Sequence, residues 1–453
     1  MMRDPEQGMA GYLAGLTTSM GRTAFSDEDR LLVRQHMLDA LACAFIGCRG
    51  RAFEDLTKLC TRIKEGCPWP GSGPEGTGPD DAGMIWAFAI HAPVFDDGSR
   101  EGACHPAAVV MAAAIALSRG KSWDLVDRAV IAGYDVMVRL SRGGNPAFAQ
   151  KGFHPTSITA PFGAAATASV LLGYDRAKTQ QALCLAALGS AGLMSAFRSG
   201  QTQPLQVAWA VRSGMSAAAM AGAGHLGYAR IFEEGFYRAY LSDAPNPPVN
   251  HPLARTYAIR GSYLRPYPGC RHMHPSIDAL GEILKVHRID PDETRSIRVR
   301  TYRMAVETGI HDLNSRGDAY FNMPYAMAAR LVLGRSDYDT FHERHFENEK
   351  ILSLMKRVQV SMDPEVEGRY PHQRGSMVEI VNNEGRIFRA RVDYPSGEPE
   401  NPLSVSAVME KFRTTAGPFL SKKSMASIER ILDVSNLTGS PEETLKAVSE
   451  RLK

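Results

Sequence analysis

The sequence predicts a mainly α-helical protein, with a large all-helical domain and an inserted, smaller α+β domain. Three observations predict this fold class. The first half of the chain is rich in small and apolar residues at helical spacing, four short alternating segments lie between 296 and 392, and helical spacing returns after them. The 453 residues suffice for two or three domains of roughly 150 residues each.

The N-terminal half predicts buried helices packed closely together. The segment 28–46 carries apolar residues such as Leu31, Leu38 and Leu41 near helical spacing, and Ser26 supplies a cap just before it. From 106 to 228, runs of alanine, glycine and serine have no polar face, which is typical of buried helices. Small side chains also allow neighbouring helices to approach closely.

The second half predicts strands flanked by helices. The predicted strands are 296–304, 358–362, 377–381 and 386–392. The flanking predicted helices are 275–286 and 324–332, and the returning helices are 405–412 and 425–432. A proline-rich linker at 245–251 marks the change of character. The predicted organisation is a helical part over 1–255, the α+β domain over 256–395, and C-terminal helices over 396–453 that return to the helical domain.

Composition and charge exclude several classes of function. The 52 basic and 49 acidic residues leave a net charge of only +3, without the basic excess typical of nucleic-acid binding. No apolar run approaches the roughly 18 residues of a membrane span, and 1–16 lack a charged-then-apolar leader. The seven cysteines do not follow a zinc-binding spacing. We expect a cytoplasmic protein that binds no nucleic acid, membrane or metal.

Histidines that precede proline are the most informative polar residues. They are His105, His154, His251 and His274. Proline favours the first position of a helix, so these histidines are expected at helix N-termini, where the dipole disfavours imidazolium. Such a histidine is neutral near pH 7 and can accept a proton. The alternative is that they are ordinary caps or loop residues, which we prefer for His251.

Further acidic and basic residues surround these histidines in the sequence. Asp96 and Asp97, just before His105, are able to orient a histidine, bind a metal or act as acid and base; the alternative is a pair that caps a loop. Arg265 and Arg271 lie in a proline-punctuated loop, and arginine binds carboxylates through two hydrogen bonds. Without a cofactor motif, this inventory suits proton abstraction next to a carboxylate, as in elimination, isomerisation, epimerisation or decarboxylation.

Several longer motifs together resemble the MmgE/PrpD family. The matching segments include LDALACAFIG (38–47), GYDVMVRL (133–140), KGFHPTSITAPFGAAATASVLLGYD (151–175), YLRPYPGCRHMHPSIDAL (263–280) and FNMPYAMAARLVLG (321–334). They run in order over nearly the whole chain. The family includes 2-methylcitrate dehydratase, cis-aconitate decarboxylase and iminodisuccinate epimerase. The resemblance implies a homodimer without a cofactor, with an active site in the cleft between the helical and lid domains.

The resemblance also implies roles for individual residues. The expected catalytic residues are His105 and His154 as acid–base histidines, Asp97 as the residue that orients one of them, and Tyr325 as the donor to a leaving group. The expected substrate-binding residues are Arg265, Arg271, His274, Gln203 and Asp96. Arg265 stands where the family commonly has lysine. Which histidine is the base and which the acid stays open.

This sequence departs from the family pattern at charged positions. Gln203 replaces a lysine, Gln206 a histidine, Val94 an acidic residue, and Ser99 a histidine of many members. Losing one charge-assisted hydrogen bond costs roughly 1.5–3 kcal/mol. We therefore hypothesise that the substrate is not 2-methylcitrate, and that it has fewer carboxylates or a leaving group that needs less acid assistance. The alternative is that Arg198 or Arg212 replaces the lysine.

The expected function is that of a cofactor-independent lyase, dehydratase-like, that abstracts a proton α to a carboxylate of a small carboxylated substrate. Two alternatives remain at this point. One is an epimerase, isomerase or decarboxylase on a related substrate. The other is a non-catalytic family member, which His154→Ala would distinguish because a protein without catalysis would not depend on this histidine.

Overall fold

A computed structural model describes the structure of residues 8–60, 78–198, 202–242, 249–308, 312–435 and 440–449. The chain divides into two compact units: Met1–Leu264 with Ser404–Lys453, and Arg265–Leu403. The boundaries predicted from the sequence lie at 255 and 395, nine and eight residues before those of the structure. The predicted linker at 245–251 falls mostly outside the described residues. That the second unit acts as a lid stays a prediction.

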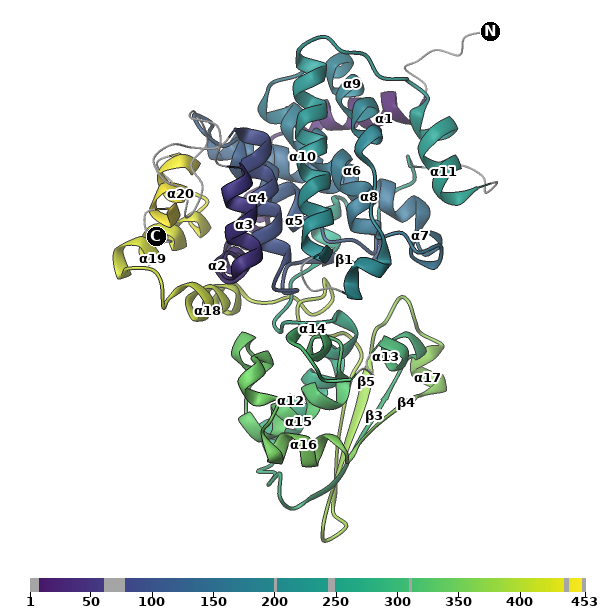
Figure 1. The fold of residues 1–453 in the computed structure, drawn as a ribbon, viewed down its shortest axis with the longest axis vertical. Helices are drawn as coiled ribbons and strands as arrows, with labels where there is room; N and C mark the ends of the chain where they lie inside the picture. Colours follow the sequence, from purple (N-terminus) through teal and green to yellow (C-terminus); the bar gives the residue numbers. More distant parts are fainter. Residues whose placement is uncertain are drawn as a thin grey trace. The chain divides into compact units, whose positions relative to one another are not determined.

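The first unit is built almost entirely of helices (Figure 1). Its N-terminal helices are α1 (Met9–Met20), α2 (Asp27–Gly47), α3 (Arg51–Cys60), α4 (Pro79–His91), α5 (Ala107–Ala116), α6 (Trp123–Gly144), α7 (Ala147–Gln150), α8 (Pro155–Leu171), α9 (Arg176–Ala186), α10 (Thr202–Gly222) and α11 (Tyr237–Leu241). Its C-terminal helices are α18 (Val405–Ala416), α19 (Lys422–Glu429) and α20 (Pro441–Ser449). A short antiparallel pair joins β1 (Gly98–Ser99) to β2 (Ser262–Tyr263).

Local signals explain where several of these helices begin. The Ser26 side chain accepts a hydrogen bond from the backbone N–H of Asp29 at the start of α2, as its position before the helix predicts. His154 is the N-cap of α8, with Pro155 at the first helical position. The helix predicted over 28–46 is therefore confirmed.

Glycines allow the helices of the first unit to approach closely, as the small-residue runs predict. A Cβ atom added at Gly214 of α10 would lie 2.2 Å from the Pro161 carbonyl oxygen of α8. At Gly47 of α2 it would lie 1.9 Å from the Ala89 carbonyl oxygen of α4. Because a backbone atom cannot move aside as a side-chain tip can, any larger residue would push these helices apart.

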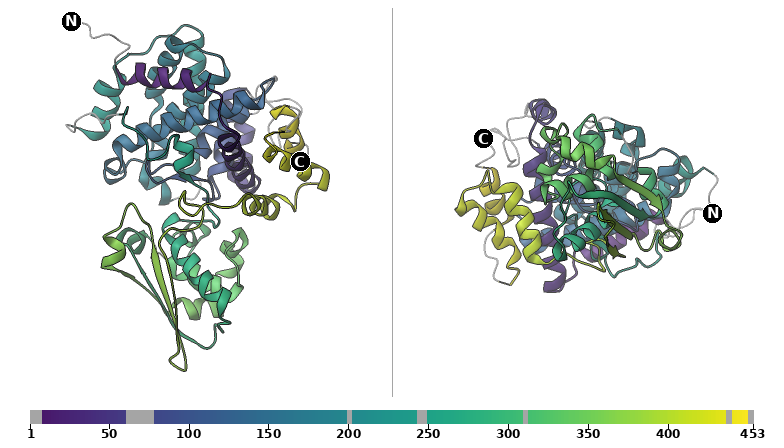
Figure 2. Two further views of the ribbon diagram at one scale, coloured as in Figure 1. Left: turned by 180° about the vertical axis from the view of Figure 1, so that it is seen from behind. Right: turned by 90° about the horizontal axis from the view of Figure 1, so that it is seen from below.

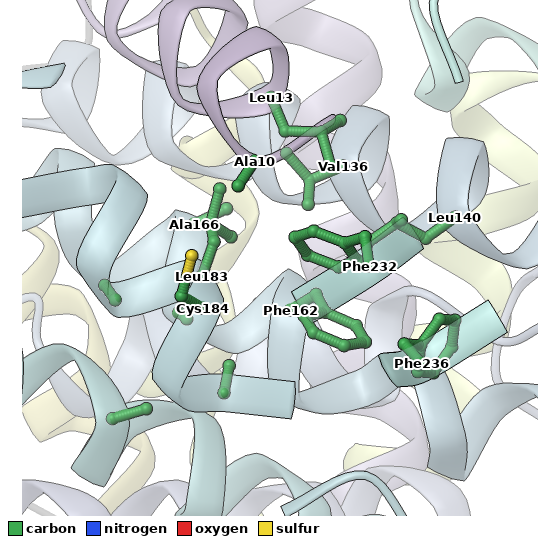
Figure 3. Packing of buried hydrophobic residues seen from close by; sticks show 14 of the residues in the cluster. Ala10, Leu13, Val136, Leu140, Phe162, Ala166, Leu183, Cys184, Phe232 and Phe236 are labelled. Carbon is green, nitrogen blue, oxygen red and sulfur yellow. The ribbon is translucent and has the colours of Figure 1, made fainter. Parts of the chain in front are cut away.

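A cluster of buried hydrophobic residues packs the N-terminal helix α1 against α6 and α8 of the first unit (Figure 3). Leu13 of α1 meets Val136 of α6, while Phe162 of α8 packs against Phe232 and Phe236. The Phe162 ring centroid lies 5.0 Å from that of Phe232 and 5.1 Å from that of Phe236, within the range of favourable aromatic pairs. This core fixes α8, which carries His154 at its start.

The second unit is an α+β unit with one sheet. Its strands are β3 (Thr294–Thr301), β4 (Val358–Met362), β5 (Ser376–Asn382) and β6 (Ile387–Val392), in the order β4-β3-β5-β6. β3 pairs parallel with β4 and antiparallel with β5, and β5 pairs antiparallel with β6. Each of the four predicted segments contains a strand, but the prediction over 296–304 runs past the end of β3 at Thr301.

Helices of the second unit lie beside this sheet (Figures 1 and 2). They are α12 (His274–Val286), α13 (Arg303–Thr308), α14 (Arg316–Ala319), α15 (Met323–Leu333), α16 (Glu349–Met355) and α17 (Pro364–Glu367). α12 packs on β5 and β6 and α15 packs on β4, while the short α13 and α17 contact β4 and β3. Ile277 and Leu280 of α12 and Val378 and Ile380 of β5 are fully buried, and these two elements pack against each other. Apolar residues therefore recur at helical spacing on α12 and at every second position on β5.

Among the described residues, no single helix has both the length and the apolar character to cross a bilayer. In the same part of the chain, α2 and α3 reach that length and character when taken together, but they are bent by 103° at their junction.

Candidate active site

Three histidines from separate segments come together in the first unit. His91 ends α4, His105 precedes α5, and His154 caps α8. The ring centroid of His91 lies 5.4 Å from that of His105 and 6.1 Å from that of His154. The Phe197 ring meets His154 edge-on, with 4.9 Å between centroids. Two of these three histidines are the ones that the sequence singles out, and His91 is an addition.

The hydrogen bonds of His105 define its tautomer. Its Nδ1 lies 2.6 Å from the backbone carbonyl oxygen of Asp97. A carbonyl only accepts, so Nδ1 carries the proton. In the neutral ring, Nε2 then holds the lone pair that can accept a proton. The backbone N–H of His105 donates to Thr156 Oγ1 at 3.2 Å, which ties this segment to the first turn of α8.

Asp97 is fully buried and bonds to several residues, and its backbone carbonyl group orients His105. Its Oδ1 accepts from the backbone N–H of Ala107 at 2.8 Å. Its Oδ2 accepts from the Tyr134 hydroxyl at 2.7 Å and lies 2.8 Å from His36 Nδ1. The resemblance implies that Asp97 orients one of the acid–base histidines. Its backbone carbonyl bonds to His105, whereas its carboxylate bonds to His36. Sequence reasoning missed both His36 and Tyr134.

His154 is held in the opposite way to His105. Its Nδ1 lies 2.8 Å from Ser157 Oγ and 3.0 Å from the amide Nε2 of Gln206. Only 3% of the residue is exposed. Burial lowers the pKa of His154 well below its usual value, and the neighbouring His91 and His105 lower it further. The ring is therefore neutral near pH 7.

His91 connects two residues that the sequence predicts as substrate ligands. Its Nδ1 lies 2.8 Å from Asp96 Oδ2, and its Nε2 lies 2.7 Å from Gln203 Nε2. Asp96 is fully buried and Gln203 is 6% exposed. Both side chains thus bond to His91. A signal for His91 was present in the sequence, since this histidine stands five residues before Asp96.

A buried ion pair fixes the segment that carries both aspartates. Lys411 of α18 donates to Asp39 Oδ1 of α2 at 2.6 Å and to the Phe95 carbonyl oxygen at 2.8 Å. Its Nζ also lies 3.5 Å from the Phe95 ring centroid. Burial raises the pKa of Asp39, while the Lys411 ammonium opposes this shift. The C-terminal helices therefore anchor the residues just before Asp96 and Asp97.

Two further residues have a defined environment. Arg212, considered as a replacement for the lysine, has its Nε 2.9 Å from Asp81 Oδ1 in a partly exposed ion pair. Cys104, beside His105, is buried, and this burial raises the pKa of its thiol to about 12. Cys104 is therefore a thiol and not a thiolate near neutral pH, which argues against a nucleophilic cysteine.

The remaining predicted residues belong to the second unit. Arg265, 3% exposed, donates from Nη1 to the Gly269 carbonyl oxygen at 3.1 Å. Arg271 binds the fully buried Glu398, with 3.2 Å between Nη2 and Oε1, and donates to His274 Nδ1 at 2.9 Å. The Arg271–Glu398 pair gives Arg271 the environment of a loop anchor.

Three arginines place positive charge near His272, a partly buried histidine of this loop. Burial, together with the charges of Arg374, Arg271 and Arg265, lowers the pKa of His272 to about 3. The ring nitrogen Nδ1 of His272 lies 2.6 Å from the Tyr302 hydroxyl. The loop therefore presents arginines beside a histidine that stays neutral.

Tyr325 has the surroundings of a core residue. Its hydroxyl donates to the Thr340 carbonyl oxygen at 2.6 Å, and the residue is fully buried. Its ring packs edge-on against Phe346, and burial raises the pKa of the hydroxyl. Because this proton is committed to a backbone carbonyl, the structure offers no support for Tyr325 as a leaving-group donor, and that role stays a prediction from the resemblance alone.

The structure therefore gathers five of the predicted residues in the first unit and four in the second. The first group is His105, His154, Asp97, Asp96 and Gln203; the second is Arg265, Arg271, His274 and Tyr325. Within the described ranges, no three His, Cys, Asp or Glu side chains are grouped in a way that would hold a metal ion.

Fold and site together define a mainly α protein whose helical unit brings three histidines together beside two buried aspartates. The chain belongs to the MmgE/PrpD family. The MmgE/PrpD N-terminal domain matches residues 9–248, and the MmgE/PrpD C-terminal domain matches residues 267–437.

Curated relatives resemble the chain over most of its length. Cis-aconitate decarboxylase of Mus musculus is 24% identical over 96% of this chain and 91% of its own length. Cis-aconitate decarboxylase of Homo sapiens is 26% identical over 89% of this chain and 87% of its own. A cis-aconitate decarboxylase-like protein of Aspergillus oryzae is 24% identical over 96% of this chain and 97% of its own length.

Proposed function

We propose that this protein is a cofactor-independent lyase that acts on a small carboxylated substrate. In this proposal His105 carries a proton to or from carbon, and His154 donates a hydrogen bond to the charge that develops. The observation that carries the proposal is the opposite hydrogen bonding of two neighbouring rings. Nδ1 of His105 faces a carbonyl oxygen, whereas Nδ1 of His154 faces an amide nitrogen.

His105 is suited to transfer a proton because its Nε2 can be both basic and acidic. The Asp97 carbonyl holds Nδ1–H whether the ring is neutral or protonated. The ring therefore keeps one orientation through a cycle of gaining and losing a proton at Nε2. Positioned proton transfer of this kind typically accelerates a reaction by about 10²–10⁴-fold.

His154 is suited to a different task. A neutral imidazole donor polarises an oxygen without transferring its proton, since loss of that proton would leave an imidazolate. Fixed donors aimed at a developing negative charge stabilise the transition state strongly in a site that excludes water. We therefore assign His154 to the carboxylate or enolate oxygen on which charge accumulates.

Decarboxylation is the reaction that we favour among those the site permits. The carbon–carbon bond to one carboxylate breaks, CO₂ leaves, and the electron pair stays on carbon. The protonated His105 then delivers one proton to that carbon, and water returns a proton to the ring. Dehydration would also require an acid for the leaving hydroxide, and the neutral His154 is a poor one. The names of the relatives support the same choice.

The test is NMR of the purified protein in D₂O with cis-aconitate, citrate, 2-methylcitrate and smaller hydroxy acids. We expect one acid to release CO₂ and to take up one deuterium. His105→Gln should lower kcat by about 100-fold or more. His251→Gln is the matched control, because His251 also precedes a proline but is exposed. It lies at the end of the proline-rich segment, to which we assign no catalytic role.

Other results would replace this proposal by a named alternative. Loss of water would identify a dehydratase, and deuterium exchange without net conversion would identify an epimerase or isomerase. Full activity on 2-methylcitrate would contradict the substrate hypothesis. If the protein converts none of these acids and His105→Gln leaves a cellular phenotype unaltered, these two results together would identify a non-catalytic family member.

A further inference from the structure

The amide of Gln206 has a defined orientation. Its Oε1 accepts a hydrogen bond from the backbone N–H of Leu193 at 2.9 Å. A backbone N–H only donates, so the oxygen must face Leu193 and the amide nitrogen must face the other way. That nitrogen lies 3.0 Å from Nδ1 of His154.

This orientation favours one arrangement of protons on His154. The amide NH₂ of Gln206 only donates, so Nδ1 must accept from it. Ser157 Oγ also lies 2.8 Å from Nδ1, and its hydroxyl is able to donate or to accept. A hydrogen on Nδ1 could be accepted by Ser157 Oγ, but it would then face the N–H of the amide. Gln206 therefore disfavours both the Nδ1–H tautomer and the imidazolium, and the proton of the neutral ring is on Nε2.

The backbone around the ring keeps this contact in place. The carbonyl oxygen of Gly192 accepts from the backbone N–H of His154 at 3.1 Å. Gly192 has φ of +150°, and a Cβ atom there would lie 2.3 Å from Ser157 Cβ. Only glycine therefore lets residues 192 and 193 approach both the start of α8 and the Gln206 amide.

We propose that Gln206 is a positioning residue that fixes His154 as the Nε2–H tautomer, so that His154 serves as a permanent hydrogen-bond donor beside the proton carrier His105. The assignment deepens the proposed function and rests on it for its catalytic meaning. The tautomer itself is independent of any substrate, so it can be measured whether or not the reaction is known.

The experiment is long-range ¹H–¹⁵N NMR of the full chain labelled with [¹⁵N]histidine, at pH 7. The ¹⁵N shifts of an imidazole distinguish its two tautomers and its protonated form. The His154 signals are those lost in His154→Gln. We expect the Nε2–H tautomer in the wild type. In Gln206→Glu, an acceptor replaces the donor, so we expect a proton on Nδ1.

Activity is measured on the same samples with the acid that the panel identifies. Gln206→Glu should lower kcat by about 100-fold, with a much smaller change in KM, because a donor needed in the transition state is lost. Gln181→Glu is the matched control: Gln181 also accepts a backbone hydrogen bond through Oε1, from Gly227 at 2.8 Å, and takes no part in the site. Gln181→Glu should change neither the NMR signals of His154 nor kcat.

Each result decides the proposal. An Nδ1–H or imidazolium spectrum of His154 in the wild type would overturn it, even if Gln206→Glu failed to fold. An unchanged His154 spectrum in a folded Gln206→Glu protein, or a changed spectrum with full activity, would also overturn it. The expected tautomers with no conversion of any acid would support the assignment of Gln206 and contradict the proposed function alone.

Discussion

Gln203 is the residue at which the substrate hypothesis can be tested directly. It is almost fully buried against His91, which Asp96 holds from the other side. An ammonium group from Gln203→Lys would be able to donate to His91 Nε2 and would add one positive charge. We expect kcat/KM for a tricarboxylic acid, relative to a dicarboxylic acid, to rise by about 10- to 100-fold, since a charge-assisted contact contributes roughly 1.5–3 kcal/mol.

The control for this change is Gln203→Met, which keeps the length of the side chain and removes the donor. It should not shift selectivity toward the tricarboxylic acid. An unchanged selectivity ratio in Gln203→Lys would contradict the idea that the neutral glutamine selects for fewer carboxylates. It would instead favour a role for Arg198 or Arg212.

At the scale of elements, α18 contributes to the site from the far end of the sequence. Lys411 reaches the buried Asp39 and the carbonyl before the aspartate pair. Lys411→Met would leave a buried carboxylate without its counter-charge, a change that typically costs about 3–5 kcal/mol. We expect a loss of this size in the free energy of unfolding at pH 8, measured by urea denaturation.

The same variant has a predictable dependence on pH. Burial already raises the pKa of Asp39 above 3.8, and Lys411 limits that rise. Without Lys411 the folded-state pKa moves further up, so the folded protein is penalised progressively as pH rises from the unfolded value toward the folded one. The loss relative to wild type should therefore be smaller at pH 5 than at pH 8. Introducing Asp39→Asn as well should remove this difference, and an equal loss at both pH values would refute the assignment.

Elements were more predictable from the sequence than the contacts between them. Residues 358–362 form a strand with the predicted bounds, and α2 begins at its predicted cap, because alternation and capping are local signals. The end of α8 is local as well: Gly173, with φ of +69°, follows the C-cap Leu172 in the left-handed region that favours glycine.

The site was predictable where one short motif carries it. The His-Pro pattern finds His105 and His154, because a helix start is encoded within a few residues. The Asp97 carboxylate instead bonds to His36, Tyr134 and the backbone of Ala107. Their segments are distant in the sequence from one another, and only the fold brings them together. Likewise, no local pattern shows that the hydroxyl of Tyr325 is bound by a carbonyl 15 residues away.

At the scale of the whole molecule, the two units carry different chemistry. The histidines that suit proton transfer lie in the first unit, and Arg265, implied by the resemblance to bind a substrate carboxylate, lies in the second. Kinetics can separate these tasks. Arg265→Gln should raise KM by roughly 10- to 100-fold through the loss of one charge-assisted contact, and should change kcat less. His105→Gln should instead lower kcat.

Two further variants show whether a rise in KM reflects substrate binding or a damaged loop. Arg265→Lys keeps the positive charge and should retain most of the affinity. Arg271→Lys should instead lower the melting temperature, because the fully buried Glu398 would lose the two-nitrogen contact that Arg271 supplies. If Arg265→Gln destabilised the protein and left KM unchanged, Arg265 would be an anchor of the same kind as Arg271. The binding of carboxylate would then have to be sought elsewhere in the chain.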